Sequence, residues 1–367
     1  MKILHVITNM GIGGAERLMV DLLPRLRDMG HVVELLLFNG VDTPFRQNLA
    51  KQGIKIYELF DSHNVKENSR VYSPMNVVKL KKFIQGYDII HTHNTACQCY
   101  VPIAKKLFGI KTTLVTTEHN ATNKRRNIWW FKFFDRWIYN QYSAIVCISS
   151  QTRSNLVEYY CDKDIISTIY NGVDISRFVR PVRNIEHNKN YVLTMVAAFR
   201  TQKDYETLLK AMVLLPECYH LQIVGTGLRE EEIKQQSQSL GLDSKVEFLG
   251  MRQDVPDILE QSDIIVLSSH WEGLSLSSIE GMASGRPFVA SDVDGLHEMV
   301  DGAGVLFEHG NEKDLAEKIQ WLCEHPDEYS KVAQRCQERA RQFDISVMAE
   351  EYNKLYESLL TEDNGLK

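Results

Sequence analysis

Short apolar runs alternate with amphipathic segments of helix length along the first half of the chain. The short runs favour strands, because a helix needs a longer periodic pattern. They lie at 2–7, 32–38, 55–59, 88–92, 112–117, 144–149 and 166–170. The longer segments predict helices at 14–29, 74–85, 95–108, 127–141 and 150–160. Strands that alternate with helices indicate βαβ units and a parallel sheet.

The alternation breaks at residues 171–190, where the apolar period is lost and Gly172, Pro181 and several Asn gather. This composition is typical of an interdomain linker. The alternation then restarts, with strands expected at 191–197, 221–225, 245–250, 263–268, 287–291 and 304–307, and helices at 203–215, 228–240, 254–261, 277–284, 311–324, 326–341 and 345–360. The pattern therefore predicts two doubly wound α/β domains, with a cleft at the carboxyl ends of their strands.

Composition adds few constraints of its own. Apolar residues make up 44% of the chain and charged residues 25%, as in ordinary soluble enzymes. The net charge of −6 argues against a general nucleic-acid binder. The seven cysteines form no C-x-x-C pair, which favours reduced thiols. The apolar start MKILHVITNM reads as a first strand rather than a signal peptide, and no apolar run reaches the ~18 residues of a membrane span. We therefore expect a cytoplasmic protein.

The segment 268–291, SSHWEGLSLSSIEGMASGRPFVAS, carries the densest candidate chemistry. Ser277 or Ser278 can cap a helix that Gly285 ends, which places Glu280 in the first turn. The unpaired N–H groups of such a helix start bind phosphate, and a carboxylate beside them suits sugar hydroxyls. Glu272 lies in the loop ahead of the helix. A capping box of Ser277 with Glu280 is the simpler alternative, but it leaves Glu272 unexplained.

Other polar residues follow predicted strands. Arg200 and Lys203 stand at the head of a helix, where two cations suit a diphosphate. Gly13 and Gly14 belong to a Gly-rich turn after the first strand, but Glu16 replaces the third glycine of a dinucleotide motif, so a nicotinamide cofactor is not indicated. Three histidines, His91, His93 and His119, lie near strand ends in the runs HTH and TTEHN. They could ligate a metal, although one core histidine and one polar rim histidine is the commoner outcome of an H-x-H run.

The run from Glu272 to Glu280, with EGMASGRPFVAS after it, resembles the E-x7-E signature of retaining glycosyltransferases of family four, the "group 1" set. The resemblance implies a GT-B fold, in which two Rossmann-like domains face across a cleft. It covers nearly the whole chain. It implies an acceptor-side domain at 1–172, a nucleotide-sugar-binding domain at 173–344, and a final helix at 345–367 that crosses back to the first domain.

The resemblance also implies roles for single residues, and no bound metal or cofactor. Glu280 would hold the ribose, Glu272 the donor hexose, and His119 would contact the sugar near its reacting carbon. The remaining implied contacts are with the diphosphate (Lys203, Arg200, Gly13, Gly14 and the N–H groups near Ser277 and Ser278), with the nucleotide (Gly225 and Gly227) and with the base edge (Arg252 and Asp254). Ala198 stands where the family often has arginine, which weakens the assignment of Arg200. The D-x-D run Asp292–Asp294 falls where the family holds no metal, so we expect a turn with a helix cap.

The resulting prediction is a metal-independent retaining transferase. It would move a hexose from a nucleotide-diphosphate sugar to a saccharide or lipid-linked acceptor, in polysaccharide, lipopolysaccharide or glycolipid synthesis. A nucleotide-sugar epimerase of the same architecture and a non-catalytic bilobal sugar-binding protein remain alternatives. The epimerase would need an acid and a base at the sugar, and the binding protein is normally exported.

Residues 124–142, KRRNIWWFKFFDRWIYNQY, combine cations with aromatic residues. On a helix, Ile128, Phe131, Phe134, Trp137 and Ile138 share one face, and Trp129, Trp130 and Phe133 lie off it. The surplus aromatic residues resemble an interfacial helix that contacts anionic membrane weakly. A well-buried helix with a few exposed rings is the more common outcome.

Overall fold

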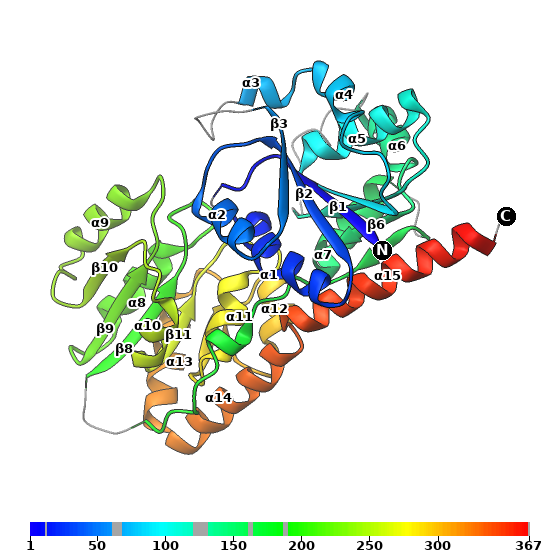
Figure 1. Cartoon of the computed structure of the whole chain (residues 1–367). Coiled ribbons are helices and arrows are strands. Elements are labelled where there is room, and N and C mark those ends of the chain that lie inside the picture. Colours follow the sequence, from blue (N-terminus) through cyan, green and yellow to red (C-terminus); the bar gives the residue numbers. More distant parts are fainter. Residues whose placement is uncertain (12, 61–67, 120–130, 161–163, 186–189, 366–367) are drawn as a thin grey trace. The chain divides into compact units, whose positions relative to one another are not determined.

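The computed structural model describes residues 1–367 except 12, 61–67, 120–130, 161–163, 186–189 and 366–367. The chain divides into two compact units. Unit 1 contains Met1–Gly172 and Ile345–Lys367, and unit 2 contains Val173–Asp344. Each unit is a parallel sheet with helices packed on it (Figure 1), which confirms the predicted α/β class.

Unit 1 contains a seven-stranded sheet in the order β3-β2-β1-β4-β5-β6-β7, and its neighbouring strands all pair in parallel. Its strands are β1 (Lys2–Ile7), β2 (Val32–Asn39), β3 (Lys55–Phe60), β4 (Ile89–His93), β5 (Thr113–Glu118), β6 (Ala144–Cys147) and β7 (Ile166–Thr168). Its helices are α1 (Gly14–Asp28), α2 (Pro44–Lys51), α3 (Asn68–Val71), α4 (Met75–Leu80), α5 (Thr95–Phe108), α6 (Phe131–Tyr139), α7 (Ser150–Tyr160) and α15 (Ile345–Gly365).

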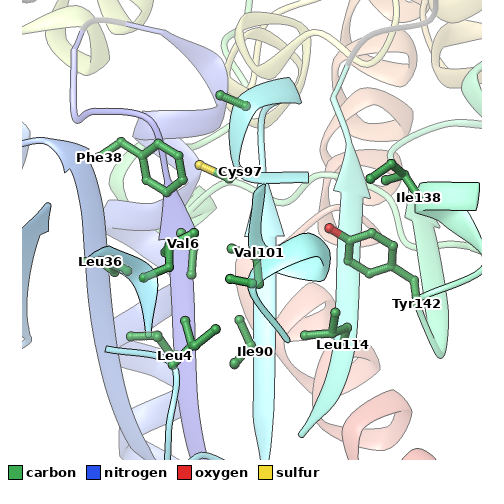
Figure 2. Packing of buried hydrophobic residues seen from close by; sticks show 14 of the residues in the cluster. Leu4, Val6, Leu36, Phe38, Ile90, Cys97, Val101, Leu114, Ile138 and Tyr142 are labelled. Carbon is green, nitrogen blue, oxygen red and sulfur yellow. The ribbon is translucent and has the colours of Figure 1, made fainter. Parts of the chain in front are cut away.

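The two faces of this sheet bury alternate residues of the same strand. Leu4 and Val6 of β1 join a cluster that includes Val101 of α5 (Figure 2). Ile3 and Ile7 join the other cluster, which includes α1 and α15. This is the period of two of a strand whose two faces are both covered. His5 therefore points to the face covered by α1 and α15, as do the odd-numbered residues of β4.

Helix α15 belongs to unit 1 because one of its faces is buried against that sheet. Ile345, Met348, Tyr352 and Tyr356 recur at helical spacing, are buried, and lie in the same cluster as α1. The last helix of the chain thus completes the layer on one face of the first sheet.

Unit 2 contains a six-stranded parallel sheet in the order β10-β9-β8-β11-β12-β13. Its strands are β8 (Tyr191–Val196), β9 (Tyr219–Val224), β10 (Val246–Gly250), β11 (Ile264–Leu267), β12 (Phe288–Ser291) and β13 (Val305–Phe307). Its helices are α8 (Tyr205–Leu214), α9 (Glu230–Ser239), α10 (Val255–Gln261), α11 (Leu276–Ala283), α12 (Asp294–Val300), α13 (Glu312–Glu324) and α14 (Pro326–Arg341).

The strand order reverses between β1 and β4 in unit 1, and between β8 and β11 in unit 2. In open α/β sheets the loops diverge at such a point and leave a crevice at the carboxyl ends of the strands, where ligands bind. The fold therefore directs attention to the loops after β1 and β4, and to those after β8 and β11.

The predicted linker is more ordered than its composition suggested. Val173 pairs with Asp344, and a short 3-10 helix, η2 (Ile175–Arg177), follows it. Phe178 is buried, and Arg183 donates its backbone N–H to Gly285 at 3.1 Å. The first part of this segment is thus packed against unit 2. Among the described helices, none is both long and apolar enough to cross a bilayer.

Candidate active site

A polar pocket of about 260 Å³ lies at the carboxyl ends of β1, β4 and β5, in unit 1. One water molecule occupies ~30 Å³ in the liquid, so the pocket has room for a sugar hydroxymethyl group or several waters. Its lining consists of Thr8, Asn9, Tyr72, Asn94, Thr95, Ala96, Gln98, Thr117, Glu118 and His119. The pocket therefore lies beside the crossover point of the first sheet.

His119 lines this pocket, directly after the last residue of β5. Its Nε2 forms a hydrogen bond with Nδ1 of His93 at 3.0 Å. Burial lowers the pKa of His119 to about 4, so its imidazole is neutral near pH 7. The predicted strand-end histidine is thus in a pocket, whereas the following Asn120 lies outside the described residues.

His91 and His93 do not divide into a core residue and a rim residue, and that expectation was wrong. Both side chains are buried; the His93 ring stacks on buried His5 of the neighbouring strand, and the His91 ring lies tilted beside it. The register of β1 and β4 pairs His5 with His91, which brings these rings together. Nitrogens of His5, His91 and His93 lie within 4.8 Å of one another. Sequence reasoning missed His5, because it stands in an apolar run.

Glu118 and Asn94 are further pocket residues that sequence reasoning did not assign a role. The Glu118 carboxylate is buried and accepts hydrogen bonds from Gln98 Nε2 at 3.1 Å and from the Tyr139 hydroxyl of α6 at 2.6 Å. Asn94, at the start of α5, has φ +67° and ψ 151°. Such a backbone conformation costs a non-glycine residue about 1–3 kcal/mol and is concentrated at functional sites.

The Gly-rich turn after β1 ends at the start of α1. Gly13 is the residue before the first helical turn, and a Cβ there would lie 2.3 Å from the Glu16 carboxylate. A Cβ on Gly14 would have no atom within 4 Å. Packing therefore gives little reason for glycine at these two positions, since the Glu16 side chain can move. A diphosphate contact at Gly13 and Gly14 stays a prediction.

Lys203 and Glu272 form a buried ion pair in unit 2. Lys203 follows β8 and Glu272 follows β11, and Lys203 Nζ contacts Glu272 Oε1 with their side chains only 10% and 6% exposed. Gln202 Nε2 donates to the other carboxylate oxygen at 2.9 Å, and Ser269 Oγ donates to Oε1 at 3.0 Å. The resemblance implies that the two charges contact different parts of a donor, whereas in this structure they contact each other.

Backbone contacts fix the two loops that carry this pair. Lys203 and Ser269 form an isolated antiparallel bridge, the Asp204 N–H donates to Ser268 O at 3.1 Å, and the His270 N–H donates to Gln202 O at 2.9 Å. Behind Glu272, a Cβ on Gly295 would lie 1.9 Å from the carbonyl oxygen of Gly273. The backbone of Glu272 and Gly273 is thus closely packed against Gly295.

The two arginines differ in their surroundings. The Arg200 side chain is exposed, and none of the described residues forms an ion pair with it, so it remains able to take an anion. Arg252 donates through Nε to Asp254 at 2.8 Å, and this pair raises the pKa of the guanidinium. Base recognition by Arg252 therefore requires Asp254 to release it or to share it.

Gly225 and Gly227 allow two loops to touch. A Cβ on Gly225 would lie 2.0 Å from Ala197 O, and one on Gly227 would lie 2.5 Å from Phe199 O. Gly225 also has φ +145°, which other residues rarely adopt. These glycines place the loop after β9 against the loop after β8 that leads to Arg200 and Lys203. Contact with a nucleotide stays a prediction.

Helix α11 begins earlier than predicted. Its N-cap is Ser275, whose hydroxyl lies 3.0 Å from that of Ser277, so Ser277 and Ser278 are inside the first turn. Glu280 is consequently in the second turn rather than the first, and a capping box of Ser277 with Glu280 does not form. The buried Ser278 hydroxyl has no hydrogen-bond partner among the described residues. Gly285 ends the helix as predicted, with φ +76°.

The D-x-D run Asp292–Asp294 leads into a helix. Asp294 is the first residue of α12, and Asp292 accepts a hydrogen bond from His297 Nδ1 at 2.6 Å. This contact raises the pKa of His297. The helix after this run is present, but the expected cap is not: its N-cap is Val293, and no side chain caps it.

Helix α6 exposes aromatic rings both on and off the face that the helical pattern identified. Phe133 is 72% exposed, Phe134 38% and Trp137 36%. Ile138, Tyr139 and Asp135 are the residues that it buries. Of the residues on that face, Ile138 is buried, whereas Phe134 and Trp137 are exposed. Residues 124–130, which include Trp129, Trp130 and the basic run, lie outside the described residues.

Profiles of two glycosyltransferase families match the chain in tandem. "Glycosyltransferase Family 4" matches residues 12–177, and "Glycosyl transferases group 1" matches residues 177–343. The chain is 27% identical over 63% of its length to a UDP-Gal:alpha-D-GlcNAc-diphosphoundecaprenol alpha-1,3-galactosyltransferase of Escherichia coli, and it spans 63% of that relative. It is 26% identical over 97% of its length to a GalNAc-alpha-(1->4)-GalNAc-alpha-(1->3)-diNAcBac-PP-undecaprenol alpha-1,4-N-acetyl-D-galactosaminyltransferase of Campylobacter jejuni, of which it covers 98%.

Solved structures agree on the architecture. Alr3699/HepE of Anabaena, solved with UDP, superposes with a TM-score of 0.84 at 23% identity, over 98% of this chain and all of that one. The same protein has been solved with UDP-glucose. The fold is GT-B. Models of two glycosyltransferase families thus match the two halves of the chain in order, over residues 12–343.

Proposed function

We propose that this protein transfers a hexose from a nucleoside-diphosphate sugar to a saccharide or lipid-linked acceptor, with retention of the anomeric configuration. The observation that carries the proposal is the buried Lys203–Glu272 pair at the crossover point of the second sheet, with the exposed Arg200 on the same loop as Lys203. Carboxylate and amide oxygens suit sugar hydroxyls, and the two cations suit a diphosphate. Relatives named for transfer to undecaprenol-linked sugars, and a structural neighbour solved with UDP-glucose, agree with this class.

In the proposed reaction the bond from the anomeric carbon to the diphosphate oxygen breaks, and the acceptor hydroxyl forms the new bond on the same face. Its proton leaves with the diphosphate. Lys203 and Arg200 stabilise the charge that grows on the leaving group, which is the usual largest contribution of such fixed charges. Glu272 positions the hexose, Glu280 holds the ribose, and His119 donates or accepts a hydrogen bond at the sugar.

The site fits the two alternative functions, an epimerase and a sugar-binding protein, less well than it fits transfer. An epimerase needs an acid and a base at the sugar, but Glu272 is held by Lys203, Gln202 and Ser269 and is poorly placed to exchange a proton. A binding protein would need no cations arranged for a leaving group. Catalytic turnover separates both alternatives from transfer.

The direct test is a mass-spectrometric screen of nucleotide sugars for binding and slow hydrolysis, followed by assays with saccharide and undecaprenol-linked acceptors. We expect one donor class to bind, to release free nucleoside diphosphate, and to give a product of unchanged anomeric configuration by NMR. Inversion at the anomeric carbon would refute retention. Interconversion of the nucleotide sugar without transfer would favour the epimerase, and binding without turnover would favour the binding protein.

Transfer is expected to proceed without a divalent metal, because Lys203, Arg200 and the N–H groups at the start of α11 supply positive potential at the diphosphate. Rates measured in EDTA should match those in magnesium or manganese, after correction for ionic strength. A loss of activity in EDTA that magnesium restores would show that the leaving group depends on a metal.

The exposed rings of α6 are expected to bring unit 1 to an anionic membrane, which is where a lipid-linked acceptor would be found. Phe133, Phe134 and Trp137 are exposed beside Lys132 and Arg136, and Lys106 lies 5.1 Å from the Trp137 ring. A basic residue near anionic lipid contributes about 1 kcal/mol, so binding should be weak and salt-sensitive. Vesicles with anionic lipid should sediment the protein at low salt.

The variant F133S/W137S should reduce that sedimentation at least about tenfold, because each buried aromatic ring contributes about 1.5–3 kcal/mol when fully withdrawn from water. The control is Trp321→Ser, because Trp321 is 40% exposed on α13 in the other unit. Equal vesicle binding by both variants, or none by the unaltered protein, would leave α6 without a membrane role.

A further inference from the structure

A continuous chain of hydrogen-bonded imidazoles runs from the pocket into the core of unit 1. His119 Nε2 lies 3.0 Å from His93 Nδ1, and His93 Nε2 lies 3.0 Å from His5 Nδ1. His93 and His5 are 1% and 0% exposed. Burial lowers the pKa of His5 to about 3 and that of His93 well below its ordinary value, as it does for His119. All these rings are therefore neutral near pH 7.

Because the three imidazoles are neutral, the tautomer of each ring determines the tautomer of its neighbour. A neutral imidazole has one N–H donor and one acceptor nitrogen, and each hydrogen bond holds one proton. The row of hydrogen-bonded histidines consequently exists in two ordered states. In one state every ring is protonated at Nε2, and in the other every ring is protonated at Nδ1. A single ring cannot reverse without breaking a hydrogen bond on one side.

The inner end of the chain distinguishes the two states. His5 Nε2 is buried and has no hydrogen-bond partner among the described residues. In the Nε2–H state this atom is a buried N–H without an acceptor, whereas in the Nδ1–H state it is an unused lone pair. Orphaned buried N–H groups are the rarer of the two in proteins. The interior therefore favours protonation at Nδ1 throughout the chain.

The Nδ1–H state has a chemical consequence for His119, the histidine at the pocket. His119 lines the pocket, and none of the described residues hydrogen-bonds its Nδ1. We propose that His93 and His5 are positioning residues that hold His119 as an uncharged Nδ1–H donor facing the pocket, ready to donate to a sugar oxygen. The contact with the sugar rests on the proposed function, whereas the ordered chain does not.

A metal site made of His5, His91 and His93 is the competing use of these rings. His91, however, already uses both of its nitrogens, with the Tyr356 hydroxyl 2.6 Å from Nδ1 and the Thr117 hydroxyl 2.7 Å from Nε2. Tyr352 of α15 continues this second branch, since its hydroxyl lies 2.9 Å from Thr117 Oγ1. His91 therefore stacks on the His93 ring, with 4.3 Å between centroids, but its hydrogen bonds go to Tyr356 and Thr117 instead of to the other histidines.

The first test uses the full-length protein without substrate, labelled with ¹⁵N in histidine. Long-range ¹H–¹⁵N spectra at pH 7 should show His5, His93 and His119 protonated at Nδ1. Couplings between nitrogens across the two hydrogen bonds should connect the rings in that order. Protonation of His119 at Nε2, missing couplings, or a stoichiometric metal that shifts these resonances and is removed by a chelator would each overturn the proposal.

The second test removes the two hydrogen bonds between the histidines. His93→Phe keeps an aromatic ring in the stack but forms neither hydrogen bond, so His119 should no longer be confined to one tautomer. Affinity for the nucleotide sugar found in the donor screen should fall about two- to tenfold, the range of one neutral hydrogen bond, while affinity for the nucleoside diphosphate alone stays constant. The control is His220→Gln, because His220 is half-buried on β9 in the other unit.

Equal losses for both ligands would mean that His93 has only a structural role, and an unchanged His119 tautomer in folded His93→Phe would do the same. Should His93→Phe not fold, the spectra of the unaltered protein still decide the matter. An ordered chain in a protein without transferase activity would refute the proposed function alone. Active transfer by a protein whose His119 is protonated at Nε2 would refute this inference alone.

Discussion

Lys203→Ala is expected to reduce turnover about 10²–10³-fold, the usual effect of removing one preorganised charge from a developing anion. Donor affinity should change less, because the charge on the diphosphate oxygen grows as the sugar departs. Steady-state rates and calorimetric binding of the nucleotide sugar measure the two effects separately. The control is Lys210→Ala, since Lys210 is exposed on α8. A variant that binds donor weakly but turns over normally would mean that Lys203 serves ground-state binding.

The same substitution should also destabilise unit 2. It leaves the Glu272 carboxylate buried without its cation, and such a loss typically costs about 3–5 kcal/mol. K203A/E272A removes both charges and should recover much of that stability, measured by thermal unfolding, without recovering turnover. This pairing separates the structural effect from the catalytic one. Full recovery of turnover in the double variant would show that Lys203 only neutralises Glu272.

The positions of Lys203 and Glu272 after their strands were predictable because they depend on local order. Polar residues directly after apolar strands lie at the carboxyl edge of a parallel sheet whatever the strand order. Lys203 and Glu272 were both placed there. Their pairing was not predicted, because it requires β8 and β11 to be neighbours, and those strands are separated in sequence by β9 and β10.

Contacts that depend on the register between strands were harder to predict from the sequence. The H-x-H run of β4 predicts two side chains on one face, but it does not say what faces them. His5 meets His91 because β1 and β4 pair in that register, and α15 then supplies Tyr352 and Tyr356 from far along the chain. A histidine in an otherwise apolar first strand was the available signal.

Helix ends were misjudged where several candidates compete. Helix α2 was missed, although Thr43 accepts a hydrogen bond from the Arg46 N–H and Pro44 stands at the first helical position, a recognisable start signal. In α11, three serines could each have been the cap, and Ser275 is the one used. For α6, the helical pattern identified an apolar face but could not tell whether a neighbour covers it.

The corrected start of α11 sharpens the role expected of Glu280. With Ser275 as the N-cap, the capping box of Ser277 with Glu280 does not form, so the start of α11 should survive Glu280→Gln. Nucleotide affinity should nevertheless fall about ten- to a hundredfold, because a hydrogen bond to a charged group is worth about 1.5–3 kcal/mol. Calorimetry with the nucleoside diphosphate measures this loss. Glu317→Gln, at an exposed position on α13, is the matched control.

Deoxyribonucleotides identify the contact. If Glu280 holds the ribose, the unaltered protein should prefer the ribonucleotide over its 2′-deoxy and 3′-deoxy forms, and Glu280→Gln should lose most of that preference. An amide oxygen still accepts a hydrogen bond but lacks the charge that strengthens it, so a small residual preference is expected. If Glu280→Gln binds the ribonucleotide as tightly as the unaltered protein does, Glu280 does not contact the nucleotide, and the ribose must be held elsewhere on unit 2.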